Sequence, residues 1–526
     1  MYCGTGFSQL RQFFLEVMAA DNENILQLLE RSSRYRQLFC VSAFFWLNLS
    51  VGFAQGLTVA QIPSLSSDED LVKMDEEELS WFASLGFIAS ILGHLLGGFI
   101  ANKFGRKTGA TIIYPFFISG FLLSGLGTIA LLYVGRGLAG VASGLQAAST
   151  SSYYSEVTSP NLRMTVHSSA MVANCVGVLL PIVFTRFTGS WRLFAVIASS
   201  APILGFIHIF FIPESPAWLV LRGKLKKAKR SLKKIRGPEY PHDVEIDHLK
   251  QSLISINGDS NTPRSILQRI KDPDVWKPFI IVNMTFVLQV WTGFAILRAY
   301  TIVILQASGS RLNPYDITLV SRCFTTLGQF LCTLVNTRLG RRTIFILSGF
   351  FSAISLAGLG ISVGLHPCST ELFSQPNSTA IIETCVDYHG ILNFLPAIFL
   401  CSYCLSYCLG VGPIPWMYSN ELYPTDLRSV LYSFAACLVP LQNFLGSKTL
   451  PDIMSSLGLT YTMFMFGGVS LLCVFWGFFV LPETKGLTLH EINLLFRDKQ
   501  AGAKFCGEQG RYSAVHTIIR SRTISE

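Results

Sequence analysis

Charged side chains are scarce in this chain of 526 residues: Asp, Glu, Lys and Arg make up 14% of it, and the mean hydropathy is +0.45. Soluble globular domains carry about 25% charged residues. The composition therefore excludes an ordinary soluble domain and predicts a polytopic membrane protein. Acidic residues are rarest of all inside the long apolar segments, and none falls deep within one of them.

Motifs of catalysis and metal binding are also missing. The sequence shows no Ser/His/Asp set, no phosphate-binding loop and no cluster of metal ligands, and most of its 13 cysteines lie in apolar segments, where a free thiol behaves as a small hydrophobe. We expect no enzyme activity, no metal and no cofactor. The formal net charge of +9 could suggest nucleic acid, but Lys and Arg gather beside apolar segments, where cytoplasmic loops are normally positive. No nucleic-acid partner is expected.

One basic stretch divides the chain. Residues 213–277 interrupt the apolar segments and carry nine Lys or Arg between Arg222 and Arg236. Such a block between two apolar halves predicts a cytoplasmic loop joining two membrane bundles. The N-terminus shows no signal peptide, because some 38 largely polar residues precede the first apolar segment.

Twelve segments are long enough to cross a bilayer, which needs about 20 apolar residues per helix. Six precede the basic block, at 39–62, 80–101, 109–132, 136–155, 165–186 and 192–212, and six follow it, at 278–305, 313–336, 342–364, 390–417, 428–450 and 458–481. The predicted organisation is a cytoplasmic arm (1–38), a six-helix bundle (39–212), a basic linker with short helices (213–277), a second six-helix bundle (278–481) and a cytoplasmic tail (482–526). The fold class is an all-α membrane protein with both termini in the cytoplasm.

Two loops are predicted to lie outside the cell. The first follows the first span and is rich in acids, which we interpret mainly as a solvated loop that caps the next helix. The second, residues 365–388, holds the glycosylation sequon at Asn377. Cys368 and Cys385 near its ends are either a disulfide or two free thiols.

Three short patterns occur in the same order in both halves. Gly105-Arg106-Lys107 recurs as Gly340-Arg341-Arg342, Glu156 with Arg163 recurs as Glu421 with Arg428, and Pro213-Glu214-Ser215 recurs as Pro482-Glu483-Thr484. Parallel six-span repeats with a site between them are typical of transporters that work by alternating access. We expect these charges at inner helix ends, where acids and bases meeting across the bundle would hold the inner side shut; simple anchoring by positive charge is the alternative for the Arg/Lys runs.

Longer motifs resemble the sugar porter family of the major facilitator superfamily over residues 40–492. They are GRGLAGVASG (135–144), YYSEVTSPNLR (153–163), PESPAWL (213–219), GVGPIPWMYSNELYPTDLR (410–428) and LPETKGLTLHEI (481–492). Within the family the chain looks most like insect facilitated trehalose transporters. The resemblance implies the major facilitator fold, with two six-helix pseudo-repeats.

Sugar contacts implied by the resemblance fall on five positions: Gln289, Gly293, Tyr300, Trp416 and Asn443. Amide groups offer donors and acceptors to sugar hydroxyls, and aromatic rings stack on the apolar face of a pyranose. Tyr300 would close the outer side.

The chain departs from the family pattern at several positions. Val290 and Ala295 replace a glutamine and an asparagine, Met171 stands where many members have glutamine, Asn102 and Thr337 replace acids, Cys408 replaces a glutamate and Ala217 replaces an arginine. These departures predict a weaker inner gate and fewer polar sugar contacts.

Coupling to protons is not expected. The carboxylate that serves in symporters of the family lies on the first span, where this chain has Ala54. We therefore expect a facilitative, uncoupled carrier of trehalose or a hexose in the plasma membrane, functional as a monomer. Arg136 is expected to hold an outer helix end.

Two other functions stay open. Arg298 and Arg322 lie in predicted spans, and although their long side chains can reach the outer interface, they favour an organic-anion carrier as the alternative. A sugar receptor that does not transport is the third hypothesis, because polar contacts and gate residues have been lost.

Overall fold

The computed structural model describes most of the chain. Its described residues are 33–61, 74–238, 269–299, 314–336, 338–365, 394–424 and 427–485, with short stretches and single residues between 238 and 314 and beside these ranges. Helices dominate them, and twelve are long and apolar enough to cross a membrane. The prediction of an all-α protein with twelve spans is confirmed.

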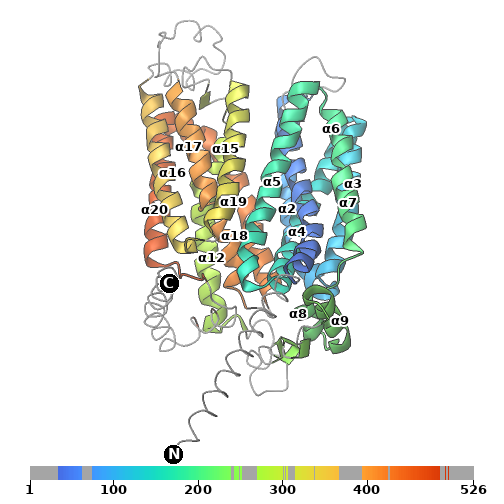
Figure 1. The fold of residues 1–526 in the computed structure, drawn as a ribbon. Coiled ribbons are helices and arrows are strands. Elements are labelled where there is room, and N and C mark those ends of the chain that lie inside the picture. The colour runs from blue at the N-terminus through green and yellow to red at the C-terminus, as the bar shows by residue number, and fades with distance from the viewer. Residues whose placement is uncertain are drawn as a thin grey trace, which may run out of the picture.

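Two bundles lie side by side (Figure 1). The first contains the span Ser33–Gln61 and the helices α2 (Glu76–Phe104), α3 (Arg106–Leu126), α4 (Ile129–Val157), α5 (Pro160–Thr188), α6 (Trp191–Ala198) and α7 (Ser200–Ile209), of which the last two form one span. The second contains α12 (Pro273–Trp291), α13 (Phe294–Ala299), α15 (Pro314–Val335), α16 (Arg341–Gly364), α17 (Leu395–Leu409), α18 (Ile414–Glu421), α19 (Arg428–Leu457) and α20 (Leu459–Phe479).

Short helices mark one end of the molecule. α8 (Pro216–Leu221) and α9 (Leu225–Arg236) lie below the first bundle (Figure 1), and α9 carries the basic run. We call this the linker end. Residues Ala228, Leu232 and Ile235 bury one face of α9, and its Lys and Arg residues occupy the other face.

Helix ends follow from local sequence. Asp75 and Glu78 form a capping box at the start of α2. α3 ends at Leu126 because Gly127 adopts a left-handed conformation (φ 82°), and Thr128 then accepts the Leu131 N–H to start α4. The predicted boundary between these two spans, near 132–136, was therefore wrong.

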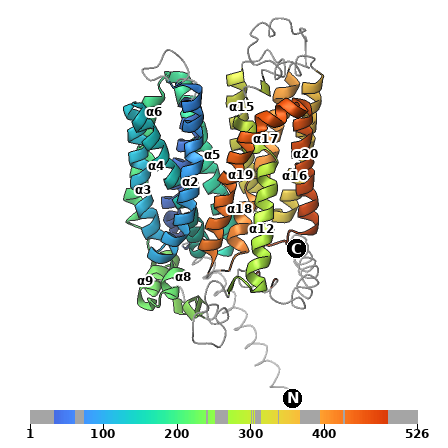
Figure 2. The same ribbon diagram turned by 180° about the vertical axis from the view of Figure 1, so that it is seen from behind.

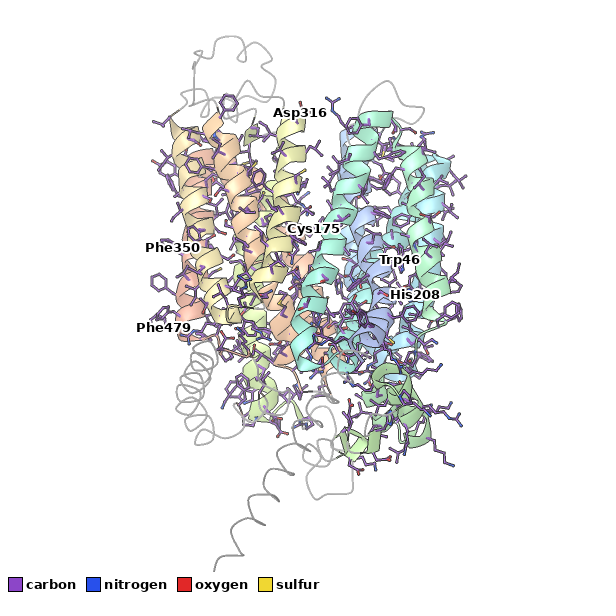
Figure 3. All side chains as sticks on the ribbon, viewed as in Figure 1. Trp46, Cys175, His208, Asp316, Phe350 and Phe479 are labelled. Carbon is purple, nitrogen blue, oxygen red and sulfur yellow. The ribbon has the colours of Figure 1, made fainter. Side chains whose placement is uncertain are left out.

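The outer surface of the bundles is apolar. Phe350 is 46% exposed and Phe479 is 79% exposed, and both point away from the helices (Figure 3). Exposed apolar area on this scale marks a membrane surface rather than a water-facing one. Each half has its own buried cluster of apolar side chains.

The halves meet mainly along two helix pairs. α5 packs against α15 on one side, and α2 packs against α19 on the other (Figures 1 and 2). These two contacts frame the space between the bundles, where the candidate site lies.

Candidate functional site

A cavity of about 150 Å³ lies between α5 and the second half. Its lining residues are Met171, Asn174, Cys175 and Val178 of α5, with Gln289, Phe294, Arg298, Arg322, Thr325, Thr326, Gln329, Tyr407, Cys408, Gly412, Pro413 and Trp416 of the second half. Cys175 lies about midway along α5 (Figure 3), so the cavity is near the middle of the bundle. A mid-bundle position between two halves is where transporters of this architecture bind substrate.

Gln289 is held in place by a break in the seventh span. α12 ends at Trp291 and α13 begins at Phe294, because Gly293 between them adopts φ 88°. A side chain is also excluded at this position, since a Cβ would lie 2.8 Å from the Phe466 ring. The Gln289 side chain is buried; its Nε2 donates to the carbonyl of Gly412 at 2.6 Å, whereas its Oε1 has no partner. That free acceptor at the cavity wall suits a hydroxyl donor on a ligand.

Trp416 reaches the cavity from a second broken span. The sequence Gly410-Val411-Gly412-Pro413 separates α17 from α18, and Ser348 Oγ accepts the Val411 N–H at 2.9 Å within this break. The Trp416 ring packs edge-on against Phe286 with centroids 4.9 Å apart. Phe294 and Tyr407 stack at 4.0 Å on the same wall, so the cavity presents aromatic faces as well as amides.

The other predicted sugar contacts fall elsewhere. Gly293 forms the helix break and does not line the cavity. Asn443 lies on α19 with its Oδ1 buried and unpartnered, but it is not among the lining residues. Tyr300 and the glycosylation site Asn377 lie outside the described residues, as do Cys368 and Cys385.

Three lining residues on α15, Thr325, Thr326 and Gln329, were not identified from the sequence. They lie three, four and seven residues after Arg322, which places all four on one face of the helix. This polar stripe in an apolar span was a usable signal. The stripe also corrects the interpretation that Arg298 and Arg322 reach the outer interface, because both line the central cavity.

Cysteines gather near the same wall. Cys401 and Cys404 stand at CxxC spacing on α17, two turns and one turn before Cys408, and all three are buried free thiols. In the described part of the chain no group of His, Cys, Asp and Glu could hold a metal ion.

At the linker end the two halves contain matching buried ion pairs. Arg106 and Glu156 meet at 2.8 Å with side chains 1% and 2% exposed, and Arg341 and Glu421 meet at 3.1 Å. The second oxygen of Glu156 accepts from Ser215, and that of Glu421 accepts from Thr484 at 2.6 Å. Both pairs connect helices of the same half.

Glu214 and Glu483 lie in loops and bind the N-termini of α3 and α16 beside these ion pairs. Glu214 accepts the backbone N–H groups of Arg106 and Lys107 at 2.9 Å each, and Glu483 accepts those of Arg341 and Arg342 at 3.0 and 3.2 Å. A carboxylate at a helix N-terminus is favoured by the helix dipole. Burial raises the pKa of Glu214, and the N–H donors of Lys107 and Ser215 oppose that rise.

Neutral groups and single cations connect the two halves at the linker end. Ser151 donates to Asn420, Arg428 Nη1 donates to Ser155 Oγ at 3.2 Å, and Asn336 donates to Ser168 Oγ at 3.1 Å. Arg163 lies near Glu421 of the other half, and their charges interact.

Arg136 is half-buried between α4 and the first span. It lies two turns into α4, and its Nη1 donates to the carbonyl of Ala54 on the first span at 2.9 Å. The guanidinium therefore contacts the backbone at the position where the sequence lacks an acid.

Residues 31–496 match the family described as sugar (and other) transporter. The chain belongs to this family. Facilitated trehalose transporter Tret1 of Culex quinquefasciatus is 27% identical to this member of the sugar transporter family over 477 residues, which are 90% of this chain and 86% of the relative.

Other relatives are longer than this sugar transporter family member. Tret1 of Aedes aegypti is also 27% identical over 477 residues, but the chain spans only 55% of that protein, about half its length. Among solved structures, the proton:xylose symporter XylE bound to 6-bromo-6-deoxy-D-glucose has a TM-score of 0.73 and 19% identity, covering 88% of this chain and all of that one. An inward open XylE from E. coli has a TM-score of 0.60 at 19% identity, covering 87% of this chain and 99% of that one. These structures support the major facilitator fold.

Proposed function

We propose that this protein is a facilitative, uncoupled carrier of trehalose or a hexose that works by alternating access. The observation that carries the proposal is the central cavity, where Gln289 and Trp416 stand among amide, hydroxyl and aromatic groups contributed by both halves. Such a mixture matches a sugar, which has hydroxyls at its edge and an apolar face. Gly293, Tyr300 and Asn443 are proposed to support this site, and Tyr300 to close it from the outside.

The linker-end charges are proposed to form the inner gate. The two sets are Arg106, Glu156, Arg163 and Glu214, and Arg341, Glu421, Arg428 and Glu483. Cross-half hydrogen bonds at this end, such as Arg428 with Ser155, would part when the cavity opens toward the linker. Within-half ion pairs would keep each set rigid during that movement.

The orientation is proposed from charge. The Lys and Arg residues of α9 favour a cytoplasmic position for the linker end, because positive loops prefer that side. We propose that both termini are cytoplasmic, that the membrane is the plasma membrane and that one chain is sufficient for transport. Arg136 would hold the first span against α4 near the opposite end.

Uncoupled transport is supported by the lining of the cavity, in which no Asp or Glu appears among the described residues. Proteoliposomes with the purified full chain, labelled trehalose and labelled glucose test the proposal without an imposed ion gradient. Saturable equilibration of either sugar is expected, and replacing Gln289 with alanine should raise KM about tenfold because a polar contact in a desolvated site is lost. Uptake only under a proton gradient would contradict the uncoupled mechanism.

A further inference from the structure

Two arginines face the central cavity without an acid. Arg298 on α13 and Arg322 on α15 both line it, and no hydrogen bond or ion pair of either guanidinium occurs in the described part of the chain. Arg322 is 4% exposed, and its Nε is buried without a partner. The two charges lie close enough to interact with each other.

This arrangement is costly in an empty site. Taking a charge out of water is unfavourable unless it is paired, and a second like charge nearby adds repulsion. The thiols of Cys175, Cys404 and Cys408 lie within electrostatic range of both arginines, and a neutral thiol is only a weak acceptor. Arg298 also has the Tyr407 hydroxyl within that range. Charged residues kept at the interior of a membrane bundle generally serve a ligand or a pathway.

Cys408 lines the same cavity as a thiol and carries no carboxylate. A carboxylate there would neutralise one arginine. With cysteine in its place, the wall formed by α13, α15 and α17 keeps its full positive charge.

We propose that Arg298 and Arg322 bind the anionic group of an acidic monosaccharide, a carboxylate or a phosphate, while Gln289 and Trp416 contact its ring. The guanidinium fork matches both groups through paired hydrogen bonds. Gln329, 4% exposed with an unpartnered Nε2 on the cavity wall, supplies a further donor. The inference rests on the proposed carrier function and specifies the class of substrate for the same site.

Transport of an anion without coupling moves charge, so membrane potential provides the test. Proteoliposomes of the full chain would receive labelled D-glucuronate, glucose 6-phosphate, trehalose or D-glucose under a potassium diffusion potential, positive inside. A singly charged anion should accumulate tenfold for each ~59 mV, whereas a neutral sugar only equilibrates. Glucuronate and glucose 6-phosphate distinguish the carboxylate from the phosphate as the bound group.

Variants assign the effect to the arginines. R298Q, R322Q and C408E should each lower the ratio of acidic to neutral sugar uptake at least tenfold, because each removes or neutralises one positive charge. R322K keeps the charge and should stay within about threefold of the original ratio. The matched control is R230Q, because Arg230 is exposed on α9, far from the cavity. If R322Q does not fold, R298Q and C408E carry the test.

Each outcome decides a separate point. If trehalose or glucose equilibrates but neither acidic sugar is transported or competes, the inference is wrong and the carrier function stands. If acidic sugars are transported but the three variants keep the ratio, the assignment to Arg298 and Arg322 is wrong. If no sugar crosses the membrane and none binds, the proposed function fails together with the inference.

Discussion

Arginines inside this protein occur in two settings, at the linker end and at the central cavity. Arg106 and Arg341 are each matched by a carboxylate of the same half, whereas Arg298 and Arg322 have none in the described chain. A paired charge deep in a protein is tolerated only while its partner is present. Arginine therefore stabilises the bundle at the linker end, where it is paired. At the central cavity its charge is left for a ligand to neutralise.

Glu156→Gln tests this at the residue scale. The substitution leaves the guanidinium of Arg106 buried without its counter-charge, so we expect a loss of about 3–5 kcal/mol of stability, as for other buried pairs that lose one partner. Thermal unfolding of the purified protein in detergent measures the effect. Glu421→Gln should behave in the same way.

Asp243→Asn is the control for that experiment. Lys229 contacts Asp243 at 2.7 Å and lowers the pKa of the Asp243 carboxyl. Both side chains of this linker pair are exposed to solvent. Water screens such a pair, so the unfolding midpoint should not change. An unaltered midpoint for Glu156→Gln would contradict the stabilising role of the buried pair.

At the scale of the element, glycine sets where helices start and break. Gly105 precedes α3 with φ 109°, a conformation that side chains rarely adopt, and it brings the backbone against the carboxylate of Glu214. Gly293 breaks the seventh span beside the cavity in a comparable way. The elements that carry functional groups are thus interrupted where those groups are needed.

Gly105→Ala should destabilise the linker end by about 1–3 kcal/mol for the backbone conformation alone. A Cβ at this position would lie 2.3 Å from Glu214 Oε2, so the carboxylate must also move from the helix N-terminus. Gly137→Ala in α4 is the matched control, because no atom lies within 4 Å of its added Cβ and alanine favours helix. Thermal unfolding of both variants decides; equal midpoints would refute the cap.

On the scale of the whole molecule, the two halves are closed upon each other at the linker end. Ser151 with Asn420 and Ser155 with Arg428 connect helices 269 and 273 residues apart in the chain. Alternating access requires these contacts to separate, because a rocking motion of the halves opens one side at a time. The proposed function therefore depends on an interface held by hydrogen bonds that can break.

A disulfide across this interface should stop transport. With Ser151 and Asn420 both changed to cysteine and then oxidised, uptake into proteoliposomes should fall more than tenfold and return on reduction. A second pair, at Ser348 and Ser406, connects α16 and α17 within one half, where Ser348 Oγ donates to the Ser406 carbonyl at 2.6 Å. Oxidation there should leave uptake nearly unchanged; equal inhibition by both pairs would argue against relative motion of the halves.

The sequence by itself determined the twelve spans, because a bilayer requires about 20 apolar residues in each helix. Such a run is visible in the local sequence without knowledge of the fold. It also identified the repeated acids and bases, because duplicated motifs are visible without a fold. The turn at Gly127 was missed because one left-handed glycine ends a helix without interrupting the apolar run.

Only the tertiary structure decided which charges meet. Arg106 pairs with Glu156 of its own half, and Arg322 joins Arg298 at the cavity instead of reaching the outer interface. These outcomes depend on the rotation of each helix about its axis and on its neighbours, which no spacing along one helix specifies. Hydropathy determines that a segment crosses the membrane, whereas packing determines which side chains face the central cavity and therefore what that cavity can bind.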